Sequence, residues 1–371
     1  MIGLLHAYSF WNRGDGLLVE LTLARLARYG VGANDVVLVA LDKKSFAEVV
    51  PHRLAMGTRG RGFTWGLVPA VARGVGLAVP SLARLPVGRA ARALRRCDAL
   101  VAVGGGYLRA DSAVSSTGVT LNHLPQLVAA ARHRGPTLYL PQSIGPLRGP
   151  AGAAVRRTLR SVDVVCVRDP DSEEELDGLP NVHRVPDLAV LDIADDADEI
   201  SHVDTGRPVG FVARRVGRAP GYEDHLVAVA RALGEGAVWP VQSTVHRSKS
   251  DAVHYERLGV EPAGPLYEWL KQRRLSVVVS VRLHGALMAL RAGVPAIHLA
   301  YEPKGPAAFS DLGLGDWCFD VGSLDRDELA AAVKELAADP APYWRQFDAR
   351  VDDLRSASRG LDELVKATVN G

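Results

Sequence analysis

The chain has 371 residues, of which 47% are hydrophobic and 23% are charged, as in soluble globular enzymes and unlike disordered proteins. Its length exceeds what one hydrophobic core usually serves, and no apolar stretch is long enough to span a bilayer, so we expect two domains and no membrane helix. The net charge of +2 indicates no particular partner, and the three widely spaced cysteines match no metal spacing and suit a reducing, cytoplasmic compartment.

The N-terminus lacks the basic region of a signal peptide, and residues 2–8 are predicted to form the first strand. The loop SFWNRGDG then leads into a helix expected to begin at Asp15. This loop is not a GxGxxG fingerprint, so it does not favour a dinucleotide site. Asn12 is a candidate ligand-binding residue, whereas Asp15 has two interpretations, a helix cap or a catalytic base.

Residues 49–97 contain many arginines and no acidic residue. One interpretation is a peripheral contact with an anionic membrane or with a phosphorylated acceptor. The other is a solvated basic face that covers the core. No basic-aromatic module or known binding fold accompanies these arginines, so we do not expect a nucleic-acid partner.

Two further predicted strands of this half end in polar or glycine-rich loops. Residues 99–103 lead into three glycines, which predict a loop whose backbone passes close to an anion or a sugar, or else a tight turn. Residues 137–140 lead into the segment PQSIGP. The DPD segment at 169–171 superficially resembles a metal-binding DxD, but it fits a helix cap better, so no metal site is expected. The binding candidates here are Gly104, Gly105, Gly106, Gln142 and Ser143.

The acidic segment DIADDADEI, residues 192–200, shows neither helix nor strand periodicity and predicts a linker near residue 200. A second alternation of strands and helices follows it, and its first strand ends on Arg214. Strands alternating with helices in both halves predict an α/β fold of two doubly wound, Rossmann-like domains, 1–198 and 199–371, that face one another across a cleft.

The most informative stretch is LSVVVSVRLHGALMALRAGVPAIHLAYEPK, residues 275–304. A β-branched run predicts a buried strand that stops at an arginine and a histidine, and a short helix leads to a second strand. Ligands of open α/β sheets bind at the carboxyl ends of strands, where helix N-termini favour anions. A capping or inter-domain contact is the alternative for an isolated pair of this kind. The candidates at this edge are Arg282, His284, Gly285 and Lys304.

The segments NRGDG, DALVAVGGG, LPQSIGP, VRDPDS, PDLAV and SVRLHGALMALRAGVPAIHLAYEPK occur in this order between the first strand and about residue 319. In this respect the chain resembles the polysaccharide pyruvyl transferase family, and RLHG is the most specific segment. The resemblance implies a fold like that of GT-B glycosyltransferases. It also implies transfer of pyruvate from phosphoenolpyruvate onto two hydroxyls of a sugar as a cyclic ketal, with release of phosphate.

By the same resemblance, Arg214, Arg282, Leu283 and His284 would hold phosphoenolpyruvate in the second domain, and 1–198 would be the acceptor side. Two guanidinium groups match the carboxylate and the phosphate of this substrate. His284 would donate a proton and Asp15 would accept one. Gly16 departs from relatives, which commonly have an acidic residue there, so Asp15 is the only base candidate in its loop.

The implied partners are phosphoenolpyruvate as a co-substrate, no other cofactor, and a glycan acceptor that a lipid could carry at the inner face of the membrane. Two alternatives remain open at the level of sequence. One is a GT-B glycosyltransferase that uses a nucleotide-sugar, since its diphosphate could bind the same cationic residues. The other is a non-catalytic glycan-binding protein of the same fold.

Overall fold

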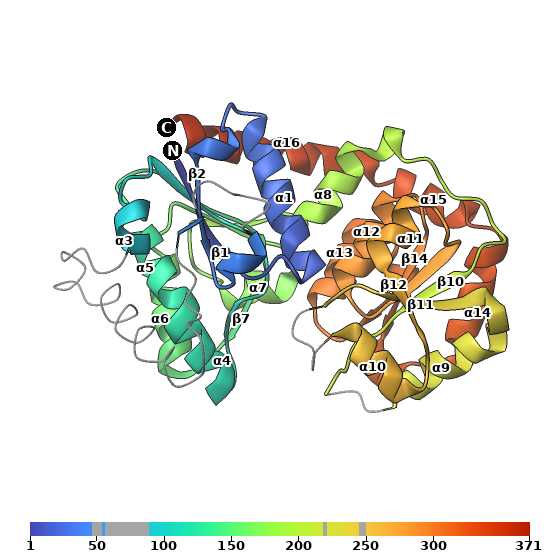
Figure 1. The fold of residues 1–371 in the computed structure, drawn as a ribbon. Helices are drawn as coiled ribbons and strands as arrows, with labels where there is room; N and C mark the ends of the chain where they lie inside the picture. Colours follow the sequence, from blue (N-terminus) through green and yellow to red (C-terminus); the bar gives the residue numbers. More distant parts are fainter. Residues whose placement is uncertain (47–53, 56–88, 218–220, 245–249) are drawn as a thin grey trace. The chain divides into compact units, whose positions relative to one another are not determined.

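The computed structural model describes residues 1–46, 54–55, 89–217, 221–244 and 250–371 (Figure 1). The chain divides into two compact units. These differ from the continuous segments 1–198 and 199–371 expected from the sequence, because the C-terminal residues return to the first unit. The first unit comprises Met1–Phe10, Asp15–Leu188 and Arg359–Gly371, and the second comprises Trp11–Gly14 and Ala189–Ser358.

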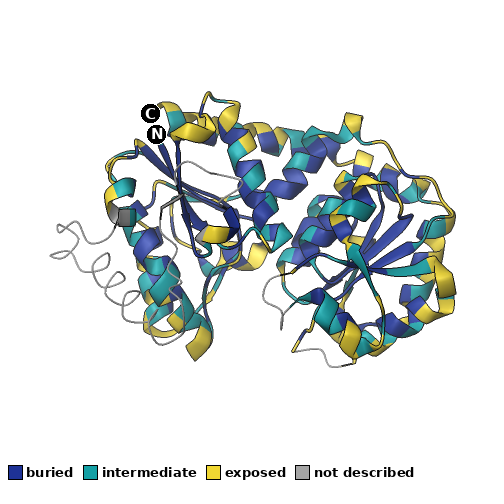
Figure 2. Ribbon diagram, in the orientation of Figure 1, coloured by how far each residue is buried: buried dark blue, intermediate teal, exposed yellow. Residues whose placement is uncertain are grey.

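The first unit is built on a parallel seven-stranded sheet in the order β3-β2-β1-β4-β6-β8-β9. The central strands are buried along their whole length (Figure 2), as expected where helices cover both faces of a parallel sheet. The strands are β1 (Ile2–Ala7), β2 (Val36–Ala40), β3 (Leu54–Ala55), β4 (Ala99–Ala102), β6 (Thr137–Gln142), β8 (Val164–Val167) and β9 (Val182–Arg184), and a separate pair is formed by β5 (Leu108–Ala110) and β7 (Ile144–Leu147). The helices are α1 (Arg13–Ala27), α3 (Arg89–Leu94), α4 (Ala113–Gly118), α5 (Leu124–Ala131), α6 (Gly149–Leu159) and α7 (Pro170–Glu175).

The second unit is built on a parallel six-stranded sheet in the order β12-β11-β10-β13-β14-β15. Its three central strands are also fully buried. The strands are β10 (Val209–Val212), β11 (Ala237–Val241), β12 (Pro262–Pro265), β13 (Val277–Ser280), β14 (Ala296–Ala300) and β15 (Cys318–Asp320). The helices are α9 (Tyr222–Leu233), α10 (Asp251–Leu258), α11 (Leu266–Lys271), α12 (Leu283–Arg291), α13 (Lys304–Asp311), α14 (Arg326–Ala338) and α15 (Ala341–Asp348), while α8 (Leu188–Asp195) and α16 (Val351–Asn370) contain the points where the chain passes between units.

Each sheet has one point where the strand order reverses. In the first unit this switch lies between β1 and β4, and in the second it lies between β10 and β13. Ligands of doubly wound sheets bind beyond the carboxyl ends of the strands at such a switch. The predicted α/β fold with two Rossmann-like parallel sheets is therefore confirmed, and its topology places both sets of candidate residues at the switch points.

The acidic segment expected to lack secondary structure is in part helical, because α8 extends to Asp195. Tertiary partners explain the difference. Arg291 pairs with Asp192 and Asp196, and Ser358 donates a hydrogen bond of 2.8 Å to Asp195. The carboxylates that weaken the periodicity of this segment are thus neutralised by residues distant in sequence, which a local pattern does not reveal.

Candidate functional site

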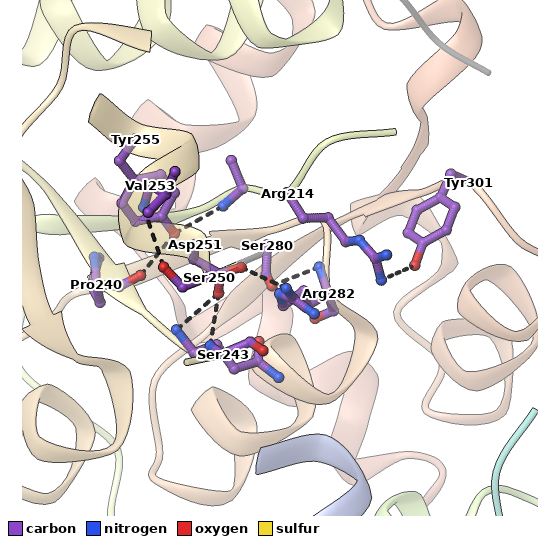
Figure 3. Close-up of polar contacts among 12 residues, drawn as sticks. Arg214, Pro240, Ser243, Ser250, Asp251, Val253, Tyr255, Ser280, Arg282 and Tyr301 are labelled. Atoms are coloured by element: carbon purple, nitrogen blue, oxygen red, sulfur yellow. Dashed lines mark hydrogen bonds and ion pairs between the residues drawn. The ribbon is translucent and has the colours of Figure 1, made fainter. Parts of the chain in front are cut away.

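The candidate site of the second unit lies where β10, β13 and β14 end side by side. β13 pairs in parallel with both neighbours, with Ser280 opposite Val212 and His298. Arg214 and Arg282 each follow their strand by two residues, at the switch point itself. Figure 3 shows both guanidinium groups at this edge, with Tyr301 beyond Arg214. The structure therefore brings together the two arginines that the sequence analysis assigned to an anionic substrate.

Arg282 is held by a buried carboxylate. Its Nη2 donates to Asp251 Oδ1 at 2.5 Å, while Asp251 is 1% exposed and the Arg282 side chain is 13% exposed. The backbone of Arg282 is also fixed, because its N–H donates to Ser280 Oγ at 3.1 Å and its carbonyl accepts from that hydroxyl at 2.7 Å. Arg282 is thus set in one orientation before any ligand binds.

Arg214 is held by tyrosines. Tyr301 Oη accepts a hydrogen bond of 3.0 Å from Arg214 Nη1, and the guanidinium also lies 5.5 Å from the centre of the Tyr301 ring. Tyr222 Oη accepts from the backbone N–H of Arg214 at 3.3 Å and donates to its carbonyl. Tyr255 Oη binds the N–H of the preceding residue at 3.2 Å. In the described part of the chain, Arg214 is therefore positioned by neutral phenols rather than by a carboxylate.

His284 is the second residue of α12 and is only partly buried. The segment Trp11–Gly14 belongs to the same unit, and a Cβ added at Gly14 would lie 2.8 Å from His284 Nδ1. The imidazole therefore approaches the backbone of Gly14 closely, and a side chain at this position would require His284 to shift. Asn12, from the same segment, forms an isolated antiparallel bridge with Ser243.

A second histidine, His298, lies behind this edge and differs from His284 in its burial. It is 2% exposed, and its Nδ1 lies 2.8 Å from the carbonyl oxygen of Ser280. Burial, with smaller contributions from the nearby Lys304 and His284, lowers its pKa to about 4, although the hydrogen bond to Ser280 acts in the opposite direction. His298 is thus neutral near pH 7, with Nδ1 as the donor to the carbonyl, and it supports the end of β13.

The remaining candidates of this edge have distinct environments. Gly285 has no room for a side chain, since a Cβ would lie 2.3 Å from Gln242 Oε1 and 2.7 Å from the hydroxyl of Ser280. Leu283 is buried, so its side chain belongs to the core and only its backbone at the start of α12 can face a ligand. Lys304 forms an ion pair of 2.6 Å with Glu302, and both are partly exposed.

The candidates of the first unit lie at the switch between β1 and β4. A Cβ at Gly104 would lie 2.6 Å from the carbonyl oxygen of Pro141, and one at Gly106 would lie 3.9 Å from Ser143 and Arg168. The chain therefore approaches the loop after β6 closely at Gly104 and leaves more space at Gly106. Gly105 is buried between them and its carbonyl accepts from the N–H of Ser143 at 2.8 Å.

The polar side chains of this first edge are mostly engaged with one another. The hydroxyl of Ser143 donates to Asp169 and accepts from Arg168 Nε at 3.0 Å. Arg168 also pairs with Asp187, and these two side chains are 2% and 1% exposed. Gln142 is fully buried, and neither of its amide atoms has a hydrogen-bond partner among the residues that the structure describes.

Asp15 and Asp169 illustrate two uses of aspartate at a helix start. Asp15 lies in the first turn of α1 and is partly buried; because that helix begins at Arg13, Asp15 is not its cap. Asp169 caps α7 by accepting from the N–H of Ser172 at 2.9 Å, which confirms the cap interpretation of the DPD segment. In the described part of the chain, no group of three or more histidine, cysteine, aspartate or glutamate residues could hold a metal ion.

Several residues that shape these edges were not assigned a role from the sequence. Tyr301, Arg168 and Asp187 do occur inside family-like segments, which is a signal that could have found them. Asp251 and Tyr222 have no such signal, because they reach the site from the starts of α10 and α9. Most of the arginine-rich stretch 49–97 lies outside the described residues, so its membrane interpretation stays a prediction. No helix in the described ranges is long and apolar enough to cross a membrane.

Comparison with solved structures supports the fold. UDP-GlcNAc 2-epimerase from Neisseria meningitidis, bound to UDP-GlcNAc, has a TM-score of 0.55 at 13% identity, covering 98% of this chain and 99% of the other. Alr3699/HepE from Anabaena, in complex with UDP and glucose, has a TM-score of 0.54 at 12% identity, covering 100% of this chain and 99% of the other. At such low identity these neighbours show that the chain has the GT-B-like fold, and they show nothing about its substrate.

Comparison at the level of sequence gives a more specific result. A search of curated proteins gives no match. The family model described as polysaccharide pyruvyl transferase, however, matches residues 12–303, which include both switch points and the segment with Arg282 and His284. Since this match covers more than half of the chain, the protein belongs to the polysaccharide pyruvyl transferase family.

Proposed function

We propose that this protein transfers the pyruvyl group of phosphoenolpyruvate to two hydroxyls of a glycan acceptor as a cyclic ketal and releases phosphate. The observation that carries the proposal is the pair of pre-positioned arginines, Arg214 and Arg282, at the switch point of the second sheet. The central carbon of phosphoenolpyruvate carries a carboxylate and, through an oxygen atom, a phosphate. Two guanidinium groups can each bind one of these anions through two hydrogen bonds.

The start of α12 adds to this anion site. Its first residues, Leu283 and His284, directly follow Arg282, and the free N–H groups of a helix N-terminus favour negative charge. Gly285 allows the helix to begin close to Ser280 and Gln242. Lys304, at the start of α13, supplies a further positive charge that Glu302 partly offsets.

The proposed reaction adds one acceptor hydroxyl to the substituted carbon of phosphoenolpyruvate while the methylene carbon gains a proton and becomes a methyl group. His284 is the proposed donor of that proton, and Asp15 is the proposed acceptor of the hydroxyl proton. Phosphate then leaves with its bonding electron pair, and the second hydroxyl attacks the same carbon and loses its proton. The arginines stabilise the departing phosphate by charge and hydrogen bonding.

Acceptor recognition is proposed for the switch point of the first unit. Gly104, Gly105 and Gly106 present backbone rather than side chains there, and the buried amide of Gln142 offers a donor and an acceptor to a sugar hydroxyl. Ser143 would contribute chiefly by shaping this edge, because its hydroxyl already binds two side chains. We place the reaction in the cytoplasm, at the inner face of the membrane if a lipid carries the acceptor.

The test is incubation of the protein with phosphoenolpyruvate and a set of glycan acceptors, followed by mass spectrometry and a phosphate assay. The expected result is a glycan that gains one pyruvate less one water, together with stoichiometric inorganic phosphate. Release of a nucleoside diphosphate from a nucleotide-sugar, without use of phosphoenolpyruvate, would instead identify a glycosyltransferase. Glycan binding without either product would identify a non-catalytic binding protein.

A further inference from the structure

We propose that Asp251 positions Arg282 and thereby gives the two arginines different tasks, Arg282 orienting the bound anion and Arg214 supplying most of the net positive charge. The proposal rests on the proposed function, since it concerns how the same site handles phosphoenolpyruvate. Asp251 is a positioning residue here, because it contacts Arg282 and not the substrate.

Both carboxylate oxygens of Asp251 have defined partners. Oδ1 accepts from Arg282 Nη2 at 2.5 Å, and Oδ2 accepts from the backbone N–H groups of Gln242 and Ser243 at 3.1 and 2.8 Å. The backbone N–H of Asp251 in turn donates to the carbonyl of Ser243 at 3.0 Å. Asp251 therefore links the end of β11, the start of α10 and the guanidinium that follows β13 (Figure 3).

Burial makes this contact directional. Asp251 is 1% exposed, so its carboxylate has little water to compete with the guanidinium. A buried carboxylate that already accepts two backbone N–H groups cannot turn without leaving them unpaired. Arg282 is consequently held in one rotamer, and its remaining N–H donors point in a fixed direction relative to the strand ends.

The charge balance of the two arginines differs for the same reason. Arg282 and Asp251 together form a neutral pair, which attracts a distant anion weakly although it binds a well-placed one through directed hydrogen bonds. Among the described residues, Arg214 forms hydrogen bonds with the phenol of Tyr301 and, through its backbone, with that of Tyr222, and neither group offsets its charge. Loss of the Asp251 charge should therefore impair the orientation of the bound anion without weakening its affinity.

The discriminating variant is Asp251→Asn, which keeps the shape and an acceptor for the backbone N–H groups but removes the charge. Misplacement of a reacting group by about 1 Å can cost about a hundredfold in rate. We expect kcat to fall by about that factor while phosphoenolpyruvate binds as tightly as before or more tightly, because a negative charge has been removed beside an anion site. Calorimetric titration with phosphoenolpyruvate, beside steady-state kinetics, measures both quantities.

Asp192→Asn is the matched control, because Asp192 pairs with Arg291 at the opposite end of α12 and is remote from the switch point. This variant should leave kcat and phosphoenolpyruvate affinity unchanged. If Asp251→Asn loses phosphoenolpyruvate binding, or keeps normal kcat, Asp251 does not orient Arg282 for catalysis and the proposal is overturned. A fall in thermal stability with equal losses in kcat and affinity would likewise reduce Asp251 to a structural residue.

A second measurement separates this proposal from the proposed function. The NMR signals of the two Nη groups of a guanidinium are resolved when its rotation is restricted by a strong contact and merge when it turns freely. We expect resolved Arg282 signals in the wild-type protein and in Asp192→Asn, and merged signals in Asp251→Asn. Wild-type protein that does not turn over phosphoenolpyruvate would overturn the function alone, whereas unchanged Arg282 signals in Asp251→Asn would overturn the positioning role.

Discussion

The switch points of the two sheets have the same topology, but their arginines differ in burial and in the partners they contact. In the first unit Arg168 is 2% exposed and pairs with a buried aspartate, so its charge is balanced within the protein and is shielded from a ligand. In the second unit Arg214 is partly exposed and contacts neutral phenols, while Arg282 keeps an exposed fraction beside its carboxylate. Topology therefore specifies where a ligand can bind, and the burial and partners of each side chain decide whether that side chain can contact the ligand.

The largest expected effect tests whether the second switch point carries the chemistry. His284→Gln should lower turnover by about a hundredfold to ten-thousandfold, because glutamine keeps some hydrogen bonding but has no transferable proton. Phosphoenolpyruvate should still bind, whereas Arg282→Ala should abolish binding. His183→Gln, at an exposed histidine of β9, is the control. Normal turnover in His284→Gln would mean that the proton comes from another residue or from water.

The next effect separates a structural arginine from a binding one. Arg168→Met removes one partner of a buried ion pair, the cation that faces the buried carboxylate of Asp187, and such a change typically costs about 3–5 kcal/mol of unfolding free energy. Arg214→Met removes a partly exposed side chain and should change stability by less than about 1 kcal/mol while weakening phosphoenolpyruvate binding strongly. Urea unfolding and calorimetric titration of both variants measure the contrast. Similar stability losses in the two variants would show that the comparison drawn from burial is wrong.

Acidification should destabilise the first unit more steeply than the second. Burial, and then the proximity of His123, hold the pKa of His6 well below its usual value, and burial lowers the pKa values of His123 and His298 to about 4. These neutral histidines contribute stability that is full above their unfolded pKa of about 6.5 and is lost as the pH falls toward 4. In that pH window each of these histidines lowers the free energy of unfolding by up to about 1.4 kcal/mol per pH unit.

Among the described residues, the first unit has two buried histidines of this kind in mutual contact, with 3.2 Å between their Nδ1 atoms. The described part of the second unit has one buried histidine, His298, and two less buried ones with lowered pKa values, His202 and His254. Hydrogen exchange measured on peptides from each unit between pH 6.5 and 5 should therefore show the steeper loss of protection in the first unit. Equal slopes in the two units would indicate that one of the buried histidines of the first unit is not neutral in the folded state.

The smallest effect concerns the glycine loop after β4. Gly104→Ala brings a Cβ to 2.6 Å from a backbone carbonyl oxygen, which cannot move independently, and should cost about 1–3 kcal/mol of unfolding free energy. Gly106→Ala meets nothing closer than 3.9 Å and should be nearly neutral for stability. If Gly106→Ala nevertheless impairs acceptor binding, the acceptor contacts the backbone at position 106. Destabilisation by both variants would mean that the whole loop serves packing.

The local pattern of the sequence was sufficient for a large part of the fold. Apolar runs predicted the buried strands, and the polar residues just beyond them predicted which edge of each sheet bears function. Arg282 and His284 were selected in this way, because a charged residue at the end of an apolar run is visible from the sequence alone, whereas Arg214 was selected through the family resemblance. The family resemblance added the substrate class that we propose, which periodicity cannot supply.

Other features depended on contacts between distant segments. The sequence shows no reason why Asp251 should meet Arg282, why Arg168 should be buried with Asp187, or why Arg359–Gly371 should return to the first unit. The pattern of the acidic residues near 192–200 likewise predicted no regular structure, because it does not reveal the arginines of other helices that pair with them.

The physical reason for this division lies in the range of the forces involved. Strand and helix periodicity follow from backbone geometry, and neighbouring residues are enough to reveal it. Burial of a charge is tolerated only when a partner reaches it, and that partner is chosen by the packing of whole elements. The sequence by itself thus determined the location of the candidate site, whereas only the tertiary structure decided which of its charged residues remain available to a ligand.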